Sequence, residues 1–291
     1  MYEIGFIGAG TVGTALAVRL GEKGYPVVAV SSRSLSSARR LAQAVPGCAV
    51  CADNQGVADS AQLVFITTPD DVIGRVAGSL AWRAGQCVVH CSGADSTAVL
   101  EPARVQGAWV GGFHPLQTFA SIRHAVENIP GSTFGIEAEG PLFGLLEDMA
   151  RALGGHAVRL EAEDKVLYHA AAVLACNYLV TLVKLATDLW HTFGVSQEQA
   201  VAALMPLLEG TLNNVENVGL PHCLTGPIAR GDVGTVEKHL AALERAAPSL
   251  VSAYRELGLQ AIPIALAKGR IDQAKAAELK ALLGTGVAIG T

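Results

Sequence analysis

A lysine and a histidine four residues apart are the pair in this sequence best suited to move a proton. Lys165 and His169 fall on one face of any helix that contains them, because 3.6 residues make one turn. Asn177 lies further along, near the same face. The lysine is predicted to polarise a carbonyl oxygen or donate a proton to it, while the histidine orients the substrate or relays the proton. Asn177 is a further candidate for the catalytic set. The alternative is a solvated lysine at the start of a helix.

Two other candidates follow predicted strands. His114 stands in the segment 111–119 (GGFHPLQTF), where Pro115 restricts the backbone beside an imidazole that titrates near neutrality. We predict that His114 transfers a proton, although it could instead cap the end of a strand. Ser92, in the segment HCSG, is predicted to hydrogen-bond a substrate oxygen, or else to serve only the turn.

The amino-terminal residues contain a pattern that binds phosphate. Ile4–Ile7 form a predicted buried strand that leads into three glycines with the spacing Gly-x-Gly-x-x-Gly. The first glycine permits the bend, the second leaves room for the cofactor, and the third lets the next helix pack on the strand. The helix amides then face a pyrophosphate. The pattern predicts a dinucleotide site made by Gly8, Ala9, Gly10, Thr11, Val12 and Gly13.

Hydroxyls and a guanidinium follow the second predicted strand, where an acidic residue would indicate NAD. Ser31, Ser32 and Arg33 suit the 2′-phosphate of NADP, because arginine forms charge-assisted hydrogen bonds with phosphate. NADP is therefore the predicted cofactor, and NAD stays open if Arg33 is only a solvated charge. Thr67, Thr68 and Pro69 follow at the end of the fourth predicted strand, where the nicotinamide half of the cofactor should pass, and we predict that these three also contact the cofactor.

Strands and helices alternate over the first half of the chain. The predicted strands are Ile4–Ile7, Val27–Val30, Ala49–Cys51, Leu63–Thr67, Cys87–His90, Ala108–Gly111, Ser132–Ile136 and Ala157–Leu160. This alternation predicts an α/β fold with a Rossmann-type, mainly parallel sheet. From Glu163 onward helical spacing dominates, which predicts an all-α C-terminal domain. We expect a dinucleotide-binding domain at 1–160 and a helical domain for substrate binding and dimerisation at 161–291.

The helical half contains one unusually apolar stretch. The predicted helices are 164–193, 196–217, 234–257, 259–268 and 272–283. Within the first of them, Val166–Val183 carries no formal charge over a length near that of a membrane span. His169, Asn177 and Thr181 interrupt this stretch, so a helix buried in a dimer is preferred to a membrane helix.

Composition narrows the possible partners. Apolar residues make up 51% of the chain and charged residues 16%, which favours apolar surface buried in a homodimer. A net charge of -5 argues against nucleic acid as a partner. The first residues form a strand rather than a signal peptide, so we expect a cytoplasmic protein. The six cysteines lack a second ligand pair at zinc-binding spacing, and we predict reduced thiols and no metal.

Together, these segments resemble a known family. The GAGTVG turn, SSRS, HPLQTF, the helix continuing as HAAAVLACNYL, and TGPIARGD are similar to a bacterial Rossmann-like family of proposed NADP oxidoreductases, which resemble deazaflavin-dependent NADP reductases. More distantly, the layout resembles the 6-phosphogluconate dehydrogenase-like superfamily. Its β-hydroxyacid dehydrogenases have a catalytic lysine followed four residues later by asparagine. The resemblance implies that Lys165 is catalytic, and His169 departs from the family by replacing the asparagine. The His114–Pro115 pair is similar to that of prephenate dehydrogenases, in which a histidine assists dehydrogenation.

These residues predict an NADP-dependent oxidoreductase. It would transfer a hydride between nicotinamide and a small carbonyl, hydroxy-acid or imine substrate. One alternative is a regulatory protein that senses NADP(H) without turnover. Another is a deazaflavin reductase, which requires a flat apolar pocket beside the nicotinamide.

Overall fold

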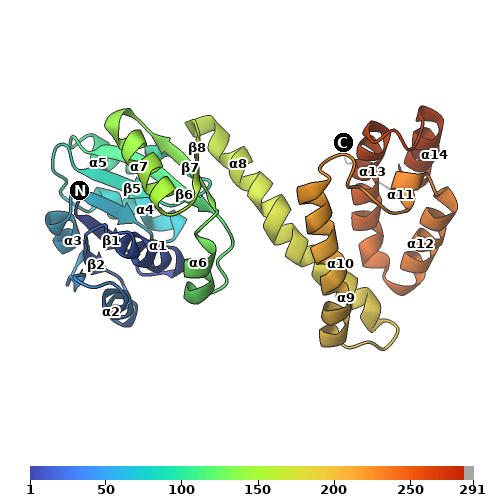
Figure 1. Ribbon diagram of the computed structural model, residues 1–291, viewed down its shortest axis with the longest axis horizontal. Coiled ribbons are helices and arrows are strands. Elements are labelled where there is room, and N and C mark those ends of the chain that lie inside the picture. Colours follow the sequence, from blue (N-terminus) through green and yellow to red (C-terminus); the bar gives the residue numbers. More distant parts are fainter. Residues whose placement is uncertain (285–291) are drawn as a thin grey trace. The chain divides into compact units, whose positions relative to one another are not determined.

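The computed structural model describes residues 1–284, which belong to two compact units (Figure 1). The first unit is Met1–Asn177, and the second begins at Tyr178. The sheet of the first unit ends at Arg159, beside the expected boundary at 160. The compact unit continues to Asn177. The helix that begins at Lys165 is held to this unit by a hydrogen bond from the Lys165 side chain to the Ser92 carbonyl. The end of the predicted second domain, 285–291, lies outside the described residues.

An eight-stranded sheet forms the centre of the first unit (Figure 1). Its strands are β1 (Ile4–Ile7), β2 (Val27–Ser31), β3 (Ala49–Val50), β4 (Leu63–Ile66), β5 (Cys87–His90), β6 (Trp109–Leu116), β7 (Thr133–Ala138) and β8 (His156–Arg159). They lie in the order β3-β2-β1-β4-β5-β6-β7-β8. All neighbours are parallel except β6 and β7, which are antiparallel. The predicted Rossmann-type, mainly parallel sheet is therefore confirmed.

Helices cover both faces of this sheet. The helices of the first unit are α1 (Thr11–Glu22), α2 (Leu35–Ala44), α3 (Asn54–Ser60), α4 (Asp70–Gly78), η1 (Thr97–Leu100), α5 (Glu101–Arg104), α6 (Ile122–Asn128), α7 (Gly140–Ala152), η2 (Ala162–Asp164), α8 (Lys165–Ala172) and η3 (Val173–Asn177). One core joins the sheet to α1, α2, α6 and α7, and the other joins it to α3, α4 and α5. Both strand faces are buried, as in other parallel sheets, so alternate residues enter different cores.

This alternation decides which way β6 presents its side chains. Phe113 belongs to the core of α1 and α7, where its ring stacks on Phe134 with centroids 4.6 Å apart. Gly112 and His114, its neighbours in the strand, therefore face the opposite side. The expected loop at 111–119 is wrong up to Leu116, because β7 pairs with β6 and prolongs it beyond the parallel part of the sheet. His114 stands on a strand, opposite Gly135.

The second unit is entirely helical within the described residues. Its helices are α9 (Tyr178–His191), α10 (Gln197–Asn217), α11 (Pro227–Arg230), α12 (Val233–Ala246), η4 (Pro248–Leu250), α13 (Val251–Ala267) and α14 (Gln273–Gly284). The predicted break after residue 257 is wrong, since α13 runs through it. The break lies instead at Pro248, because proline lacks the amide hydrogen that would continue α12. Ser196, where the predicted helix 196–217 begins, caps α10, since its side chain accepts a hydrogen bond from the Gln199 amide.

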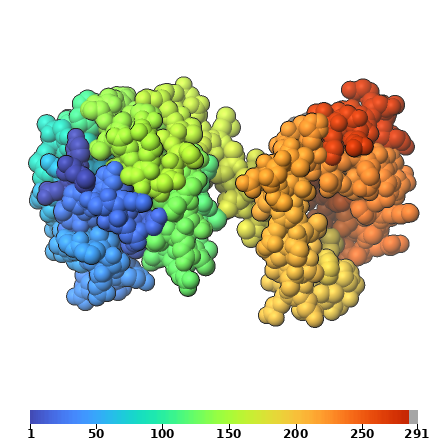
Figure 2. All heavy atoms as spheres, in the orientation of Figure 1, coloured from blue at the N-terminus to red at the C-terminus, as the bar shows by residue number. Residues whose placement is uncertain are grey.

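The predicted helix 164–193 is present, with a π-helical segment at η3 between α8 and α9. Among the described helices, Ala162–His191 is the one long and apolar enough to cross a membrane by length and composition. Its apolar window is not buried within the chain. The surface of α9 and α10, yellow to orange in Figure 2, exposes several large apolar side chains.

Candidate active site

A cavity of about 490 Å³ opens at the glycine turn between β1 and α1. Its lining comes from the ends of β1, β2 and β4 and from the start of α4, which is the carboxyl edge where parallel sheets bind ligands. The lining residues are Ile7, Gly8, Ala9, Gly10, Ser32, Arg33, Ser34, Asn54, Thr67, Thr68, Pro69, Asp71, Val72 and Val76.

The three glycines differ in what surrounds them. A Cβ atom on Gly10 would meet nothing within 4 Å, so this face of the turn is open toward a ligand. A Cβ atom on Gly13 would collide with the Thr67 hydroxyl and lie 2.7 Å from the Gly8 carbonyl oxygen. Gly8 has a φ of 112°, which disfavours other residues. The turn therefore fits a pyrophosphate at Gly10 and requires glycine at 8 and 13 for its own packing.

Most of the predicted cofactor residues line the cavity, and four do not. Thr11, Val12, Gly13 and Ser31 are absent from the lining, and of these Gly13 and Ser31 are buried. Thr67 has a structural role as well, because its hydroxyl donates a hydrogen bond of 2.8 Å to the Gly8 carbonyl and holds the turn.

Polar side chains close the cavity at the end of β2. The Ser31 hydroxyl donates to the Asn54 side chain over 2.7 Å. Ser34 caps α2 by accepting from the Ser37 amide, so the positive end of that helix faces the same corner as Arg33. Ser34 belongs to the SSRS segment that suggested NADP, whereas sequence reasoning missed Asn54, the first residue of α3. No acidic side chain from β2 enters this corner, in agreement with a 2′-phosphate rather than a free hydroxyl.

A second polar group lies on neighbouring strands at the same level of the sheet. His90 on β5 pairs with Gly112 on β6, and Gly112 pairs with Glu137 on β7. Paired residues point to the same face, so the imidazole and the carboxylate flank a position without a side chain. Lys165 of α8 fills the gap: a Cβ atom on Gly112 would lie 3.3 Å from the lysine Nζ and 3.4 Å from His90 Nε2.

Lys165 is fully enclosed. It has no exposed surface, and its Nζ donates a hydrogen bond of 2.8 Å to the Ser92 carbonyl. Burial lowers the pKa of Lys165 from its ordinary value, while the charges of Glu137, Asp95 and others oppose that shift. The lysine therefore places a buried positive charge behind the site and anchors the segment after β5.

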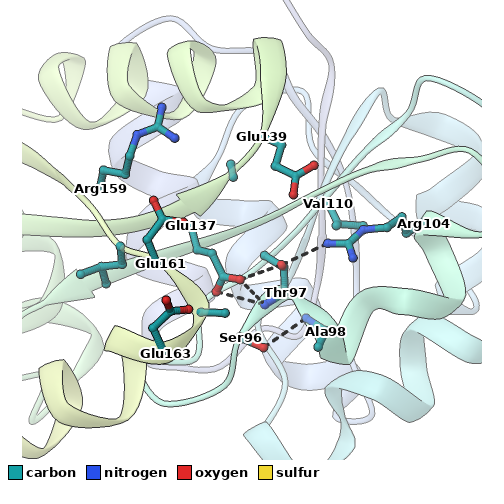
Figure 3. Close-up of a pocket in the computed structure, with 13 residues that line it drawn as sticks. Ser96, Thr97, Ala98, Arg104, Val110, Glu137, Glu139, Arg159, Glu161 and Glu163 are labelled. Carbon is teal, nitrogen blue, oxygen red and sulfur yellow. Dashed lines mark hydrogen bonds between the residues drawn. The ribbon is translucent and has the colours of Figure 1, made fainter.

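Glu137 is the carboxylate whose charge most strongly opposes the lowering of the Lys165 pKa by burial. It is 9% exposed and accepts hydrogen bonds from the Thr97 amide and from the Thr97 hydroxyl, the latter over 2.8 Å. Figure 3 shows Glu137 directed at Thr97, with Arg104 reaching the same hydroxyl from the far side. The charge of this buried carboxylate opposes the effect of burial on Lys165.

His90 is kept neutral. Its Nδ1 accepts a hydrogen bond of 3.1 Å from the Ser92 amide, so the proton of the neutral ring stands on Nε2. That Nε2 is buried and has no hydrogen-bond partner in the described residues. Burial, then the charges of Lys165 and His114, lower the pKa of His90 to about 3, and the Ser96 carbonyl opposes them.

His114 and His169 meet beside this group. Their ring centroids are 5.9 Å apart, nearly perpendicular, and both side chains are half-buried. A Cβ atom on Gly93 would lie 2.5 Å from His169 and 2.9 Å from His114 Nε2, so this glycine makes room for both rings. Burial, then the charges of Lys165 and His169, lower the pKa of His114 to about 4. Tyr168, which sequence reasoning did not select, lies 2.9 Å from His114 Nδ1.

The structure therefore brings together His114, Lys165 and His169 from the predicted set. Ser92 joins them through its backbone, but its hydroxyl donates to Asp70 over 2.8 Å and accepts from the Asp95 amide. These two hydrogen bonds stabilise the turn after β5. They fit the second of the two roles predicted for Ser92, a structural one, rather than contact with a substrate oxygen. Asn177 ends η3, about 12 Å along the helix from His169, and so lies away from the two imidazoles. The link from Ser92 to Asp70 joins the cluster to the cofactor cavity, which Asp71 lines.

The sequence also predicts reduced thiols and no metal site. Among residues 1–284 no group of three or more His, Cys, Asp or Glu side chains could hold a metal ion. All six cysteines are free thiols, and burial raises the pKa of Cys87 to about 11.

Comparisons with known proteins match two successive stretches of the chain. Residues 1–115 match the Rossmann-like domain, and residues 132–261 match a domain of unknown function, DUF2520. The structure of a proposed NADP oxidoreductase from Bacteroides fragilis covers 90% of this chain and 98% of its own, with 27% identity and a TM-score of 0.74. The two family models thus match successive parts of the chain, and the similarity to the Bacteroides fragilis protein spans both parts.

Two further proteins that resemble this chain are enzymes. The 2-(hydroxymethyl)glutarate dehydrogenase of Eubacterium barkeri is 31% identical over 109 residues, which are 35% of this chain and about a third of that enzyme's length. A pyrroline-5-carboxylate reductase of Coxiella burnetii covers 96% of this chain and 98% of its own, with 20% identity and a TM-score of 0.60, and shares the fold. These relatives are thus a dehydrogenase and a reductase, and further solved structures of the same fold are reductases that hold NADP or NADPH.

Arg33 is expected to discriminate between the two cofactors. Replacing Arg33 with Ala removes a charge-assisted hydrogen bond to the 2′-phosphate, which should weaken NADPH binding about 10- to 100-fold. NADH binding should change less than about threefold, because NADH lacks that phosphate. Calorimetric titration with both cofactors measures the effect, and Arg39→Ala is the control because Arg39 is exposed on α2 outside the cavity lining. Equal losses for both cofactors would contradict this role.

Proposed function

We propose that this NADP oxidoreductase transfers a hydride between nicotinamide and a small carbonyl, hydroxy-acid or imine substrate beside His114 and His169. The observation that carries this proposal is a pair of half-buried imidazoles next to a buried lysine, joined to the cofactor cavity through Ser92 and Asp70. Bound NADPH would supply the hydride. The protein must then hold the substrate and exchange one proton with it.

The residues that could hold NADP are those of the cavity. The open side of Gly10 and the first amides of α1 fit the pyrophosphate, and Arg33 with Ser32 fits the 2′-phosphate. Thr68 and Pro69 line the end of the cavity formed by β4 and α4. These residues of the cavity thus have the cofactor-binding roles that were predicted for them from the sequence.

Roles within the cluster follow from exposure. His114 and His169 have exposed surface and are the groups that can touch a substrate. Lys165 has none, so we assign it a positioning role: its charge holds His90 and His114 neutral, and its bond to Ser92 fixes the loop after β5. This differs from the expected direct contact of Lys165 with the substrate oxygen.

A substrate screen tests the proposal. Hydroxy acids with NADP, and keto acids or cyclic imines with NADPH, are expected to include one class that changes nicotinamide absorbance. His114→Ala should lower that turnover by about 100-fold or more while leaving NADPH affinity within about twofold. If the wild type binds NADPH and turns over no member of the three classes, the proposed reaction is wrong. The hydroxy-acid class has the support of the dehydrogenase from Eubacterium barkeri.

We further propose that the protein is a cytoplasmic homodimer formed through its helical part. Exposed apolar side chains follow one another along α8 to α10, including Leu167, Leu174, Val180, Leu207 and Leu212. A second copy of the chain offers the same surface and would cover them. Light scattering should give twice the mass of the 30.0 kDa chain. A monomer at micromolar concentration would contradict the dimer.

A further inference from the structure

Tyr168 is the polar side chain of the cluster to which the proposed function gives no role. It stands three residues after Lys165 on α8, so the two side chains share one face of the helix. Its hydroxyl oxygen lies 2.9 Å from His114 Nδ1, and the two rings meet edge to face with centroids 5.5 Å apart.

A glycine on β7 allows this approach. A Cβ atom on Gly135 would lie 2.8 Å from both the hydroxyl oxygen and the Cζ atom of Tyr168. Gly135 pairs with His114 across the antiparallel strands, so the phenol lies over the position next to the imidazole. Gly112 makes room for Lys165 in the same way, two pairs further along the β6–β7 ladder. Two glycines thus seat two side chains of α8 on the sheet.

The direction of the hydrogen bond follows from the groups present. Burial raises the pKa of Tyr168 to about 12, against the Gly135 amide, so the hydroxyl keeps its proton. That amide is a donor and cannot receive the proton. Among the described residues, His114 Nδ1 is the acceptor within hydrogen-bonding distance. The phenol therefore donates, because a partly buried hydroxyl proton without an acceptor is unfavourable.

An imidazole that accepts at Nδ1 carries its single proton on Nε2. His114 Nε2 faces Gly93 and the edge of His169. No hydrogen bond from the described residues engages this nitrogen. The Nε2–H group is consequently left for a ligand.

We propose that Tyr168 is a positioning residue that holds His114 in the Nε2–H tautomer, as a fixed hydrogen-bond donor toward an oxygen of the substrate. The inference rests on the proposed function for its substrate, and it narrows the substrate class. A carbonyl or carboxylate oxygen accepts from Nε2–H, whereas the N–H of an iminium ion does not.

Nitrogen NMR of the histidine side chains tests the tautomer without any substrate. In the wild-type protein at pH 7, two-bond proton–nitrogen correlations are expected to show His114 with Nε2 protonated and Nδ1 unprotonated. This measurement does not depend on the folding of a variant. A wild-type His114 with its proton on Nδ1 would overturn the proposal.

Tyr168→Phe removes the hydroxyl and keeps the ring. The Nδ1–H form of His114 is then expected to appear in the same spectrum, and kcat is expected to fall about tenfold with little change in NADPH affinity. Tyr178→Phe is the matched control, because Tyr178 is exposed on the next helix and should leave both readouts unchanged. In a His114→Ala background Tyr168→Phe should have no further effect on kcat, since the tyrosine acts through the imidazole.

An unchanged tautomer in Tyr168→Phe would show that another group sets it, and would overturn the role of Tyr168. A full further loss of kcat in the His114→Ala background would also contradict a role that acts through the imidazole. Failure of the proposed function is a different result, since it means no turnover by the wild type. The NMR comparison decides the inference even in that case.

Discussion

Lys165→Met should abolish most of the turnover and leave NADPH binding intact. Methionine fills the space of the lysine stem, but it supplies neither the charge over Gly112 nor the bond to the Ser92 carbonyl. The segment between β5 and η1 loses its anchor, and the two imidazoles lose the positive charge behind them. We expect kcat to fall about 100-fold or more, comparable to the removal of one oriented donor from an active site.

The same variant should change histidine titration in a defined direction. The charge of Lys165 is the second cause, after burial, that lowers the pKa of His90 and of His114. Its loss should raise both pKa values toward the ordinary value of 6.5, although burial keeps them below it. NMR titration of the imidazole protons measures this shift. Lys184→Met, which changes an exposed lysine on α9 paired with Asp188, serves as the control.

Protein stability should follow pH accordingly. Both histidines have a lower pKa in the folded protein than in the unfolded chain, so unfolding takes up protons below pH 6.5. Their contribution is fully present above that pH and is lost as the pH falls toward the folded values, about 4 for His114 and about 3 for His90. The free energy of unfolding should therefore decline between pH 6.5 and 4, and less steeply in Lys165→Met. Histidine pKa values that do not move in the variant would contradict this account of Lys165.

The parts of the fold that depend on local sequence could be predicted. The glycine turn follows from short-range spacing, and the alternation of strands and helices predicts a parallel sheet. The extension of β6 could not be foreseen, because it depends on pairing with β7 rather than on the residues from Gly111 to Leu116. Pro115 there indicates a loop in isolation, yet an extended proline fits a strand that ends beyond the parallel sheet.

The candidate site was predicted in its residue types more than in its arrangement. Lys165 and His169 are four residues apart and therefore share one face of the helix. Tyr168, three residues after Lys165, lies on the same face. An aromatic residue in that place is usually part of a core, and only the packing on Gly135 shows its bond to His114. The enclosure of Lys165 likewise depends on Gly112 and on a carboxylate from another strand. Contacts between residues so far apart in the sequence cannot be predicted from the spacing of residues within one helix.

Two glycines of the turn should respond to the same substitution in opposite ways. Gly13→Ala places a methyl group against the Thr67 hydroxyl and within 2.7 Å of the Gly8 carbonyl oxygen, so the backbone must move. We expect this variant to lose about 1–3 kcal/mol of stability, the usual cost of overpacking. Thermal unfolding without cofactor measures it. A wild-type melting temperature for Gly13→Ala would show that the turn has more room than the structure gives it.

Gly10→Ala should instead fold normally and fail to bind. The backbone at Gly10, with φ of -76° and ψ of -170°, suits alanine, and the new methyl group meets no protein atom within 4 Å. It projects into the cavity at the point where the cofactor pyrophosphate must approach the first amides of α1. NADPH affinity should fall about 100-fold, since displaced phosphate contacts are charge-assisted, while the unfolding temperature of the free protein stays within about 2 °C of wild type. Unimpaired NADPH binding by Gly10→Ala would place the pyrophosphate elsewhere, because no other part of the turn combines an open face with free helix amides.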